Sequence, residues 1–180
     1  MKDAERRAER GRTIETAAPS FGPEPLPIAL KVNGMLRRLT VEPRMTLAEV
    51  LRGPIGLTGT KIACNRGACS ACTVWLDGIP ICSCMILAID VRQRAVTTVE
   101  GLAQGEALHP VQEAFITHDA MQCGFCTPGM VMSCAALLAR SEAAFSAADV
   151  RSAISSHFCR CGTYPHVIEA TLAAAAARKS

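Results

Sequence analysis

The chain has 180 residues and a mass of 19.1 kDa, and 49% of its residues are hydrophobic, which is enough for one ordinary domain or two small ones. Its net charge of +3 does not favour nucleic acid as a partner, and its apolar stretches fall short of the roughly 18 residues that a membrane-spanning helix needs. Ten cysteines, against one tryptophan and one tyrosine, are the feature that needs an explanation.

Residues 1–25 are polar and end in a proline-rich run, which predicts a flexible N-terminal tail. An Arg6-Arg7 pair is present, but no apolar segment or small-residue cleavage site follows it. We therefore expect a cytoplasmic protein, or one carried to the periplasm with a partner that has a signal. In a reducing compartment, grouped cysteines are more often metal ligands or redox groups than disulfides.

Short alternating segments flank Asn33-Gly34, and others flank Asp77-Gly78, so each dipeptide predicts the turn of a β-hairpin. Between them, Thr46 is expected to cap a short helix through Leu51. Residues 95–99 are typical of a further strand. The first half is thus predicted to be a small sheet with one helix packed on it.

From Gly101 the spacing of apolar residues becomes helical, and it predicts four helices, at about 111–121, 128–140, 147–156 and 165–177. Thr127-Pro128 is typical of an N-cap and first turn, and Ser146 with Asp149 of a capping box. The expected fold class is α+β, with a sheet-containing domain at 26–103 and a helical domain at 104–180.

Three cysteines form a C-x4-C-x2-C run, Cys64, Cys69 and Cys72, with Cys84 as a suitable fourth ligand. This spacing is found in plant-type [2Fe–2S] sites, where a loop wraps the cluster with its N–H groups pointing at sulfur. Gly67 supplies the backbone freedom for such a loop. A zinc site would pair C-x2-C with a second such pair or with histidines, and none lies nearby in the sequence.

A second set comprises two pairs, Cys123 with Cys126 and Cys159 with Cys161. A disulfide within the C-x-C pair would be strained. Each pair precedes a predicted helix, so two helix N-termini would direct free N–H groups at one anionic site. The spacing favours an iron–sulfur cluster, and a four-coordinate zinc ion is the alternative.

Several segments together resemble the small iron–sulfur subunit of the xanthine oxidase family of molybdenum hydroxylases, over about residues 27–175. They are Cys64–Val74, Asp77-Gly78, Ser83-Cys84, Gln122–Met130 and Cys159–Tyr164. The resemblance implies an N-terminal β-grasp ferredoxin-like domain and a C-terminal four-helix domain, each with one [2Fe–2S] cluster. It implies cluster ligands at Cys64, Cys69, Cys72 and Cys84, and at Cys123, Cys126, Cys159 and Cys161.

The resemblance further implies a molybdenum–pterin cofactor that a separate large subunit holds and that Gln122 and Cys161 approach. Electrons would pass from that site through the two clusters to a FAD subunit or a cytochrome c, and this chain would have no catalytic residue of its own. The alternatives are a free-standing ferredoxin or a zinc-stabilised interaction module, but a soluble ferredoxin needs only the first half. Ser70 is a departure, because the family commonly has glycine there.

The remaining candidates have simpler interpretations. Cys82 and Cys134 match no ligand position and are expected to be small buried residues. For Cys82 the alternative is a competing ligand, because it would share a strand face with Cys84, two residues later. His118 and His157 are expected to have surface or capping roles, and Trp75 to pack in the sheet.

Overall fold

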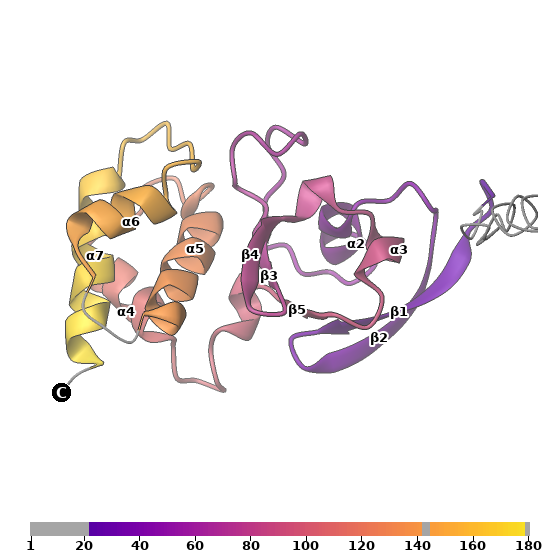
Figure 1. The fold of residues 1–180 in the computed structure, drawn as a ribbon, viewed down its shortest axis with the longest axis horizontal. Coiled ribbons are helices and arrows are strands. Elements are labelled where there is room, and N and C mark those ends of the chain that lie inside the picture. The colour runs from indigo at the N-terminus through magenta and orange to yellow at the C-terminus, as the bar shows by residue number, and fades with distance from the viewer. Residues whose placement is uncertain (1–21, 142–144, 179–180) are drawn as a thin grey trace, which may run out of the picture.

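The computed structural model describes residues 22–141 and 145–178, so the expected tail at 1–25 lies outside the described residues except for 22–25. A five-stranded sheet occupies the first half and longer helices the second (Figure 1). The elements are β1 (Leu26–Val32), β2 (Met35–Val41), α2 (Leu47–Arg52), β3 (Thr73–Leu76), β4 (Ile79–Cys82), η2 (Ser83–Met85), α3 (Ala88–Val91), β5 (Ala95–Thr97), η3 (Val99–Gly101), α4 (Pro110–Thr117), α5 (Thr127–Arg140), α6 (Ala147–Ala153) and α7 (Tyr164–Ala177).

The sheet has the strand order β2-β1-β5-β3-β4, in which β1 and β5 are parallel and the other neighbours antiparallel. Both predicted hairpins are confirmed. Their turn residues have positive φ, 49° and 78° at Asn33 and Gly34, and 52° and 76° at Asp77 and Gly78. Asn, Asp and Gly tolerate this conformation, and such turns match the twist of the flanking strands.

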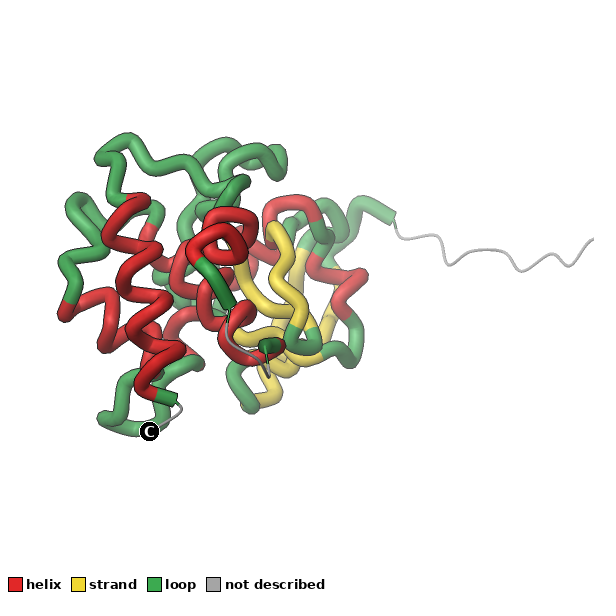
Figure 2. The backbone as a smooth tube through the Cα atoms, turned by 60° about the vertical axis from the view of Figure 1, so that its left-hand side comes forward, coloured by secondary structure: helices red, strands yellow, loops and turns green. Residues whose placement is uncertain are grey.

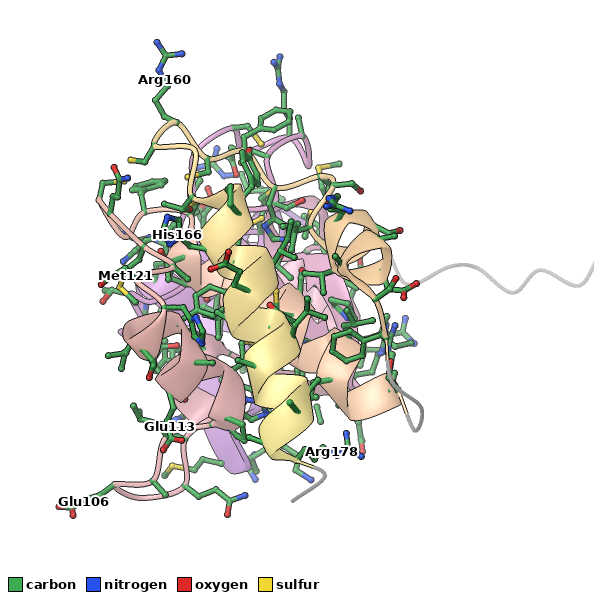
Figure 3. All side chains as sticks on the ribbon, turned by 90° about the vertical axis from the view of Figure 1, so that its left-hand side faces the viewer. Glu106, Glu113, Met121, Arg160, His166 and Arg178 are labelled. Carbon is green, nitrogen blue, oxygen red and sulfur yellow. The ribbon has the colours of Figure 1, made fainter. Side chains whose placement is uncertain are left out.

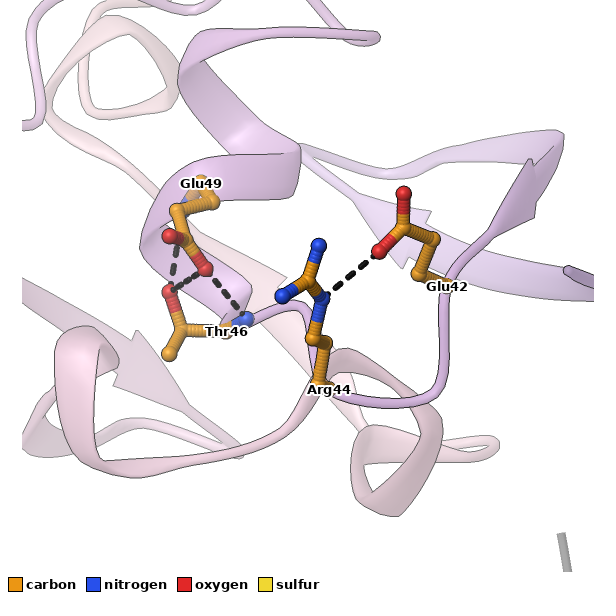
Figure 4. A network of polar contacts seen from close by, with 4 residues as sticks. All are labelled: Glu42, Arg44, Thr46 and Glu49. Carbon is orange, nitrogen blue, oxygen red and sulfur yellow. Dashed lines mark hydrogen bonds and ion pairs between the residues drawn. The ribbon is translucent and has the colours of Figure 1, made fainter. Parts of the chain in front are cut away.

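Helix α2 is fixed at its start by reciprocal hydrogen bonds between Thr46 and Glu49 (Figure 4). The Thr46 hydroxyl oxygen accepts from the Glu49 N–H at 3.3 Å, and the Glu49 carboxylate accepts from the Thr46 N–H at 2.8 Å. The N–H and hydroxyl of Thr46 hold the pKa of Glu49 below its usual value. The predicted cap is therefore confirmed, and Gly53 ends the helix.

The helices of the second half lie where the apolar spacing predicts them, with differences at their ends. Helix α4 ends at Thr117 rather than near 121, because Asp119 has a φ of 48° that a helix cannot continue through. The N-cap of α5 is Cys126, so the expectation of Thr127 as the cap is wrong by one residue. The capping box of Ser146 and Asp149 is confirmed.

Besides a small buried group of Ala48, Cys72 and Cys84, two large groups of buried side chains form the core of the described residues. One lies between the sheet and helices α2 and α3, and the other is among helices α4 to α7 and includes Met130 and Met132. Figures 1 and 2 show the strands between these two sets of helices. Trp75 on β3 joins the two halves, because its indole N–H donates to the Met132 carbonyl at 2.8 Å. None of the helices in the described part of the chain is long and apolar enough to span a membrane.

Candidate metal centres

The first four cysteines come together through the β3–β4 hairpin. Cys64 and Cys69 lie in the long loop between α2 and β3, Cys72 directly precedes β3, and Cys84 lies in η2. The hairpin register pairs Thr73 with Cys82 and so brings Ser83 next to Cys72. Both the N–H and the hydroxyl of Ser83 donate to the Cys72 carbonyl, at 3.3 and 2.7 Å. One two-residue turn, with four strand residues on each side, thus places Cys84 beside Cys72.

Backbone N–H groups of the loop point at the sulfur atoms. Arg66 and Ala68 donate to Cys64 Sγ at 3.5 and 3.3 Å, and Gly67 donates to Cys84 Sγ at 3.3 Å. The Arg66 N–H makes the largest contribution to lowering the pKa of Cys64, to about 7. Gly67 has a φ of 74°, which favours glycine, and a Cβ there would lie 2.9 Å from Cγ of the exposed Met85 side chain, which would have to shift.

The Cys64 thiol interacts with that of Cys69, and the Cys72 thiol interacts with those of Cys82 and Cys84. Cys64 is also close enough to raise the pKa of Cys84. Burial raises the pKa of Cys84 to about 11, so the free thiol would stay protonated. A metal replaces that proton, because thiolate is the ligand form. Four thiols surrounded by inward N–H groups fit the donor set of an anionic [2Fe–2S] cluster.

The second set lies at the starts of α5 and α7. The thiols of Cys126 and Cys159 interact, and Cys123 is near enough to Cys126 to raise its pKa. Burial, followed by Cys159, raises the pKa of Cys126 to about 12. Burial alone would raise the pKa of Cys159. The hydrogen bonds with Thr163 have the opposite effect, and the pKa is lowered to about 7.

The prediction that both cysteine pairs precede helices is confirmed. Cys126 is the N-cap of α5, and Cys161 comes shortly before α7, whose N-cap is Thr163. Glycines with positive φ shape both loops, 79° at Gly124 and 77° at Gly162. Between Cys159 and Cys161, the side chain of Arg160 points away from the body of the protein (Figure 3). The structure therefore brings Cys123, Cys126 and Cys159 together and places Cys161 in the same short loop as Cys159.

Within residues 22–141 and 145–178, no three Cys, His, Asp or Glu side chains are grouped as the ligands of a single metal ion. A [2Fe–2S] cluster is larger than one ion, so the four cysteines that would hold it would lie farther apart than the ligands of a single metal ion.

The loops of the two sets lie along the same edge of the molecule, at the top of Figures 1 and 2. They contact each other directly, because the Phe158 N–H donates to the Cys69 carbonyl at 3.4 Å. Gln122 is exposed in the loop between α4 and α5, beside the exposed thiol of Cys123. Cys161 is half-buried in the loop before α7.

The two spare cysteines differ from each other. Cys134 is fully buried in α5, as expected. Cys82 is half-buried, and its thiol interacts with that of Cys72 and lies 3.9 Å from Ser70 Oγ. It therefore adjoins the first set of cysteines and is more than a buried apolar residue.

His157 contradicts the expectation of a surface or capping role. It is 2% exposed, its Nε2 lies 2.7 Å from Ser133 Oγ, and burial lowers its pKa to about 4. The signal in the sequence was Ser133, a polar residue within the apolar run of α5 that needs a buried partner. His118 does end α4, and its carbonyl accepts from the ring nitrogen of His166 at 3.0 Å.

Two family models match the chain. One, described as a 2Fe-2S iron-sulfur cluster binding domain, covers residues 30–108, and the other, described as a [2Fe-2S] binding domain, covers residues 98–172.

Similar proteins span nearly the same length. The 6-hydroxypseudooxynicotine dehydrogenase complex subunit beta of Paenarthrobacter nicotinovorans is 41% identical over 145 residues, 81% of this chain and 91% of that protein. The aldehyde oxidoreductase iron-sulfur-binding subunit of Escherichia coli K12 is 38% identical over 184 residues, 93% and 80% of the two chains. A chain of quinoline 2-oxidoreductase from Pseudomonas putida 86 matches the structure with a TM-score of 0.80 and 44% identity. The match covers 87% of this chain and 98% of that chain.

Proposed function

We infer the function from the premise that this chain belongs to the small iron–sulfur subunits of the xanthine oxidase family of molybdenum hydroxylases. It contains two [2Fe–2S]-binding domains of the ferredoxin type and transfers electrons as part of a heteromeric oxidoreductase. The alternative of a free-standing ferredoxin or a zinc-stabilised module is not favoured, because relatives are subunits of enzyme complexes.

The finer proposal is that the chain holds two clusters. Cys64, Cys69, Cys72 and Cys84 would bind one, in a β-grasp domain at 26–103, and Cys123, Cys126, Cys159 and Cys161 the other, in a four-helix domain at 104–180. The inward N–H groups of Arg66, Gly67 and Ala68 support the first assignment. The position of Cys126 at the start of α5 supports the second. When bound, a [2Fe–2S] cluster takes up and releases one electron at a time.

The observation that carries the proposal is the direct contact between the two cysteine loops, in which the Phe158 N–H meets the Cys69 carbonyl. Two electron carriers that exchange electrons need to be held close and in a fixed relation, and buried side chains on both sides hold these loops. Cys126 shares one buried group with Phe115 and Met130, and Cys72 and Cys84 share another with Ala48.

The partners follow from the family. We propose a large subunit that holds a molybdenum–pterin cofactor and lies against the exposed loop of Gln122, with Cys161 as the second residue that approaches the pterin. Exposed apolar side chains beside Gln122, Met121 at 38% and Phe125 at 46%, support a protein partner on this surface. A FAD subunit or a cytochrome c would accept the electrons. We expect the complex in the cytoplasm, or in the periplasm by export with a partner.

Purification of the intact complex tests this proposal. We expect about four irons and four sulfides per chain, bound molybdenum and two distinct EPR signals after reduction. Aldehydes and nitrogen heterocycles form the substrate panel, because relatives include an aldehyde oxidoreductase and a nicotine 6-hydroxylase small subunit. Zinc in place of iron, with no visible absorbance, would overturn the proposal.

A further inference from the structure

Ser70 connects the two cysteine loops by its side chain. It lies between Cys69 and Cys72 and is only 4% exposed, and its hydroxyl donates to Ser156 Oγ at 2.8 Å. Ser156 lies in the loop that leads from α6 to Cys159. The next residue but one, Phe158, donates its N–H to the Cys69 carbonyl. Two neighbouring residues of one loop, Cys69 and Ser70, thus bond to two residues of the other loop that are separated only by His157.

The backbone of Ser70 is in a conformation that serine rarely adopts. Its φ is 54°, in the left-handed region, where a Cβ is unfavourable and glycine is preferred. The other residues with positive φ in the described part of the chain are Gly, Asn or Asp, apart from Arg92 after α3. Such a conformation persists where the surrounding contacts impose it, and it often marks a functional position.

The main chain around Ser70 is held from two sides. Its carbonyl accepts from the N–H and the hydroxyl of Thr73, at 3.2 and 2.7 Å. Helix α5 lies against the same carbonyl, because a Cβ added at Gly129 would be 2.5 Å from it. The main chain thus sets the direction of the Ser70 Cα–Cβ bond, and the hydroxyl lies 2.8 Å from Ser156 Oγ and 3.9 Å from Cys82 Sγ.

We propose that Ser70 is a positioning residue for electron transfer between the two centres. Its hydrogen bond to Ser156 holds the Phe158 N–H on the Cys69 carbonyl and so fixes the distance between the two cysteine sets. The inference rests on the proposed function, in which both sets hold clusters. One electron leaves one centre as the other gains it, and no covalent bond forms or breaks. Ser70 touches neither substrate nor acceptor, so it acts only through the loops that it joins.

The test compares Ser70→Ala, Ser156→Ala and the double variant in the intact complex. Ser155→Ala is the matched control, because its hydroxyl donates to the Ser152 carbonyl at 2.8 Å and does not join the loops. Hydrogen–deuterium exchange of the peptide that contains Phe158 measures the contact. We expect exchange about five-fold faster in either single variant, the factor that one net hydrogen bond represents. The double variant should be no faster, because both substitutions remove the same bond.

A second readout is the spin–spin splitting between the EPR signals of the two reduced centres. We expect the splitting to weaken in both single variants at unchanged iron content, and to be retained in Ser155→Ala. Ser70→Gly offers a second variant that relieves the backbone strain while it removes the hydroxyl, so it should fold and show the same loss.

The outcomes separate this inference from the proposed function. Wild-type exchange and splitting in folded Ser70→Ala and Ser156→Ala would overturn the role of Ser70 and leave the function intact. Effects that add in the double variant would also overturn it, because the two hydroxyls would then act separately. A wild-type complex with fewer than two EPR signals would overturn the proposed function and the electron-transfer role of Ser70 together.

Discussion

Ser133 Oγ and His157 Nε2 lie 2.7 Å apart, and both side chains are buried. Ser133 belongs to α5, and His157 lies in the loop that leads to Cys159. The second ring nitrogen of His157, Nδ1, is buried without a hydrogen-bond partner among the described residues. The ring is neutral near neutral pH, because burial lowers its pKa to about 4. This bond therefore attaches the loop of one cysteine pair to the helix that follows the other.

Substitution of Ser133→Ala should lower the free energy of unfolding by about 1–3 kcal/mol, since it leaves a buried imidazole with no partner at all. Thermal unfolding of the complex would show the loss as a lower Tm. Ser152→Ala, at an exposed position of α6, is the control and should leave Tm nearly unchanged. An equal Tm for both variants would mean that the buried bond contributes no net stability.

Removal of single cysteines distinguishes ligands from neighbours. We expect Cys84→Ala to lose about half of the iron, because one of two clusters can no longer form, and Cys82→Ala to retain all of it. Cys134→Ala removes a fully buried thiol within α5 that matches no ligand position, and it controls for packing. Iron per chain is the measurement. If Cys82→Ala lost iron and Cys84→Ala kept it, the fourth ligand of the first set would be Cys82.

Gly129 gives a prediction in which two physical effects oppose each other. Helix propensity alone favours alanine over glycine in α5 by about 1 kcal/mol. However, a Cβ at this position would lie 2.5 Å from the Ser70 carbonyl oxygen and 3.2 Å from that of Ala71, both backbone atoms that cannot rotate away. We expect Gly129→Ala to destabilise the protein by about 1–3 kcal/mol through this overlap. A Tm equal to or above the wild-type value would show that α5 can move away without cost.

The features that the sequence predicts well are local. Asn33-Gly34 and Asp77-Gly78 determine their hairpins through the φ values that these residues tolerate, and the Thr46 cap needs only Glu49 three residues later. Thr127-Pro128 and Pro165 likewise predict that a helix begins after each pair of the second set. In each case the interaction that decides the structure joins residues close in the chain.

The features that the sequence does not predict depend on distant contacts. His157 is buried because Ser133, 24 residues earlier, offers it a partner, and nothing in its own neighbourhood indicates this. Ser70 bonds to Ser156, 86 residues later, and its left-handed conformation depends on the packing of α5. Cys82 lies beside Cys72 because the hairpin register pairs Cys82 with Thr73, the next residue after Cys72. Of these contacts, only the hydrogen bond between Ser70 and Ser156 requires the two halves of the protein to be packed together, whereas the other two form within one half.

A pH dependence is expected from His109, the N-cap of α4. Its Nδ1 accepts a hydrogen bond from the Val111 N–H at 3.2 Å, which requires the neutral ring. Burial lowers its pKa below the ordinary value of about 6.5. The unfolded state therefore binds the proton first as the pH falls, so the stability from this cap is present above about pH 6.5 and is lost as the pH falls through the folded-state pKa. His109→Asn keeps an acceptor that does not titrate, while His109→Ala removes the cap at every pH and should cost about 1 kcal/mol.

Tm measured from pH 8 to pH 5 should fall more steeply for the wild type than for His109→Asn, since the carboxylates common to both proteins contribute equally. Parallel curves for these two proteins would show that His109 keeps its cap when the solution becomes acidic.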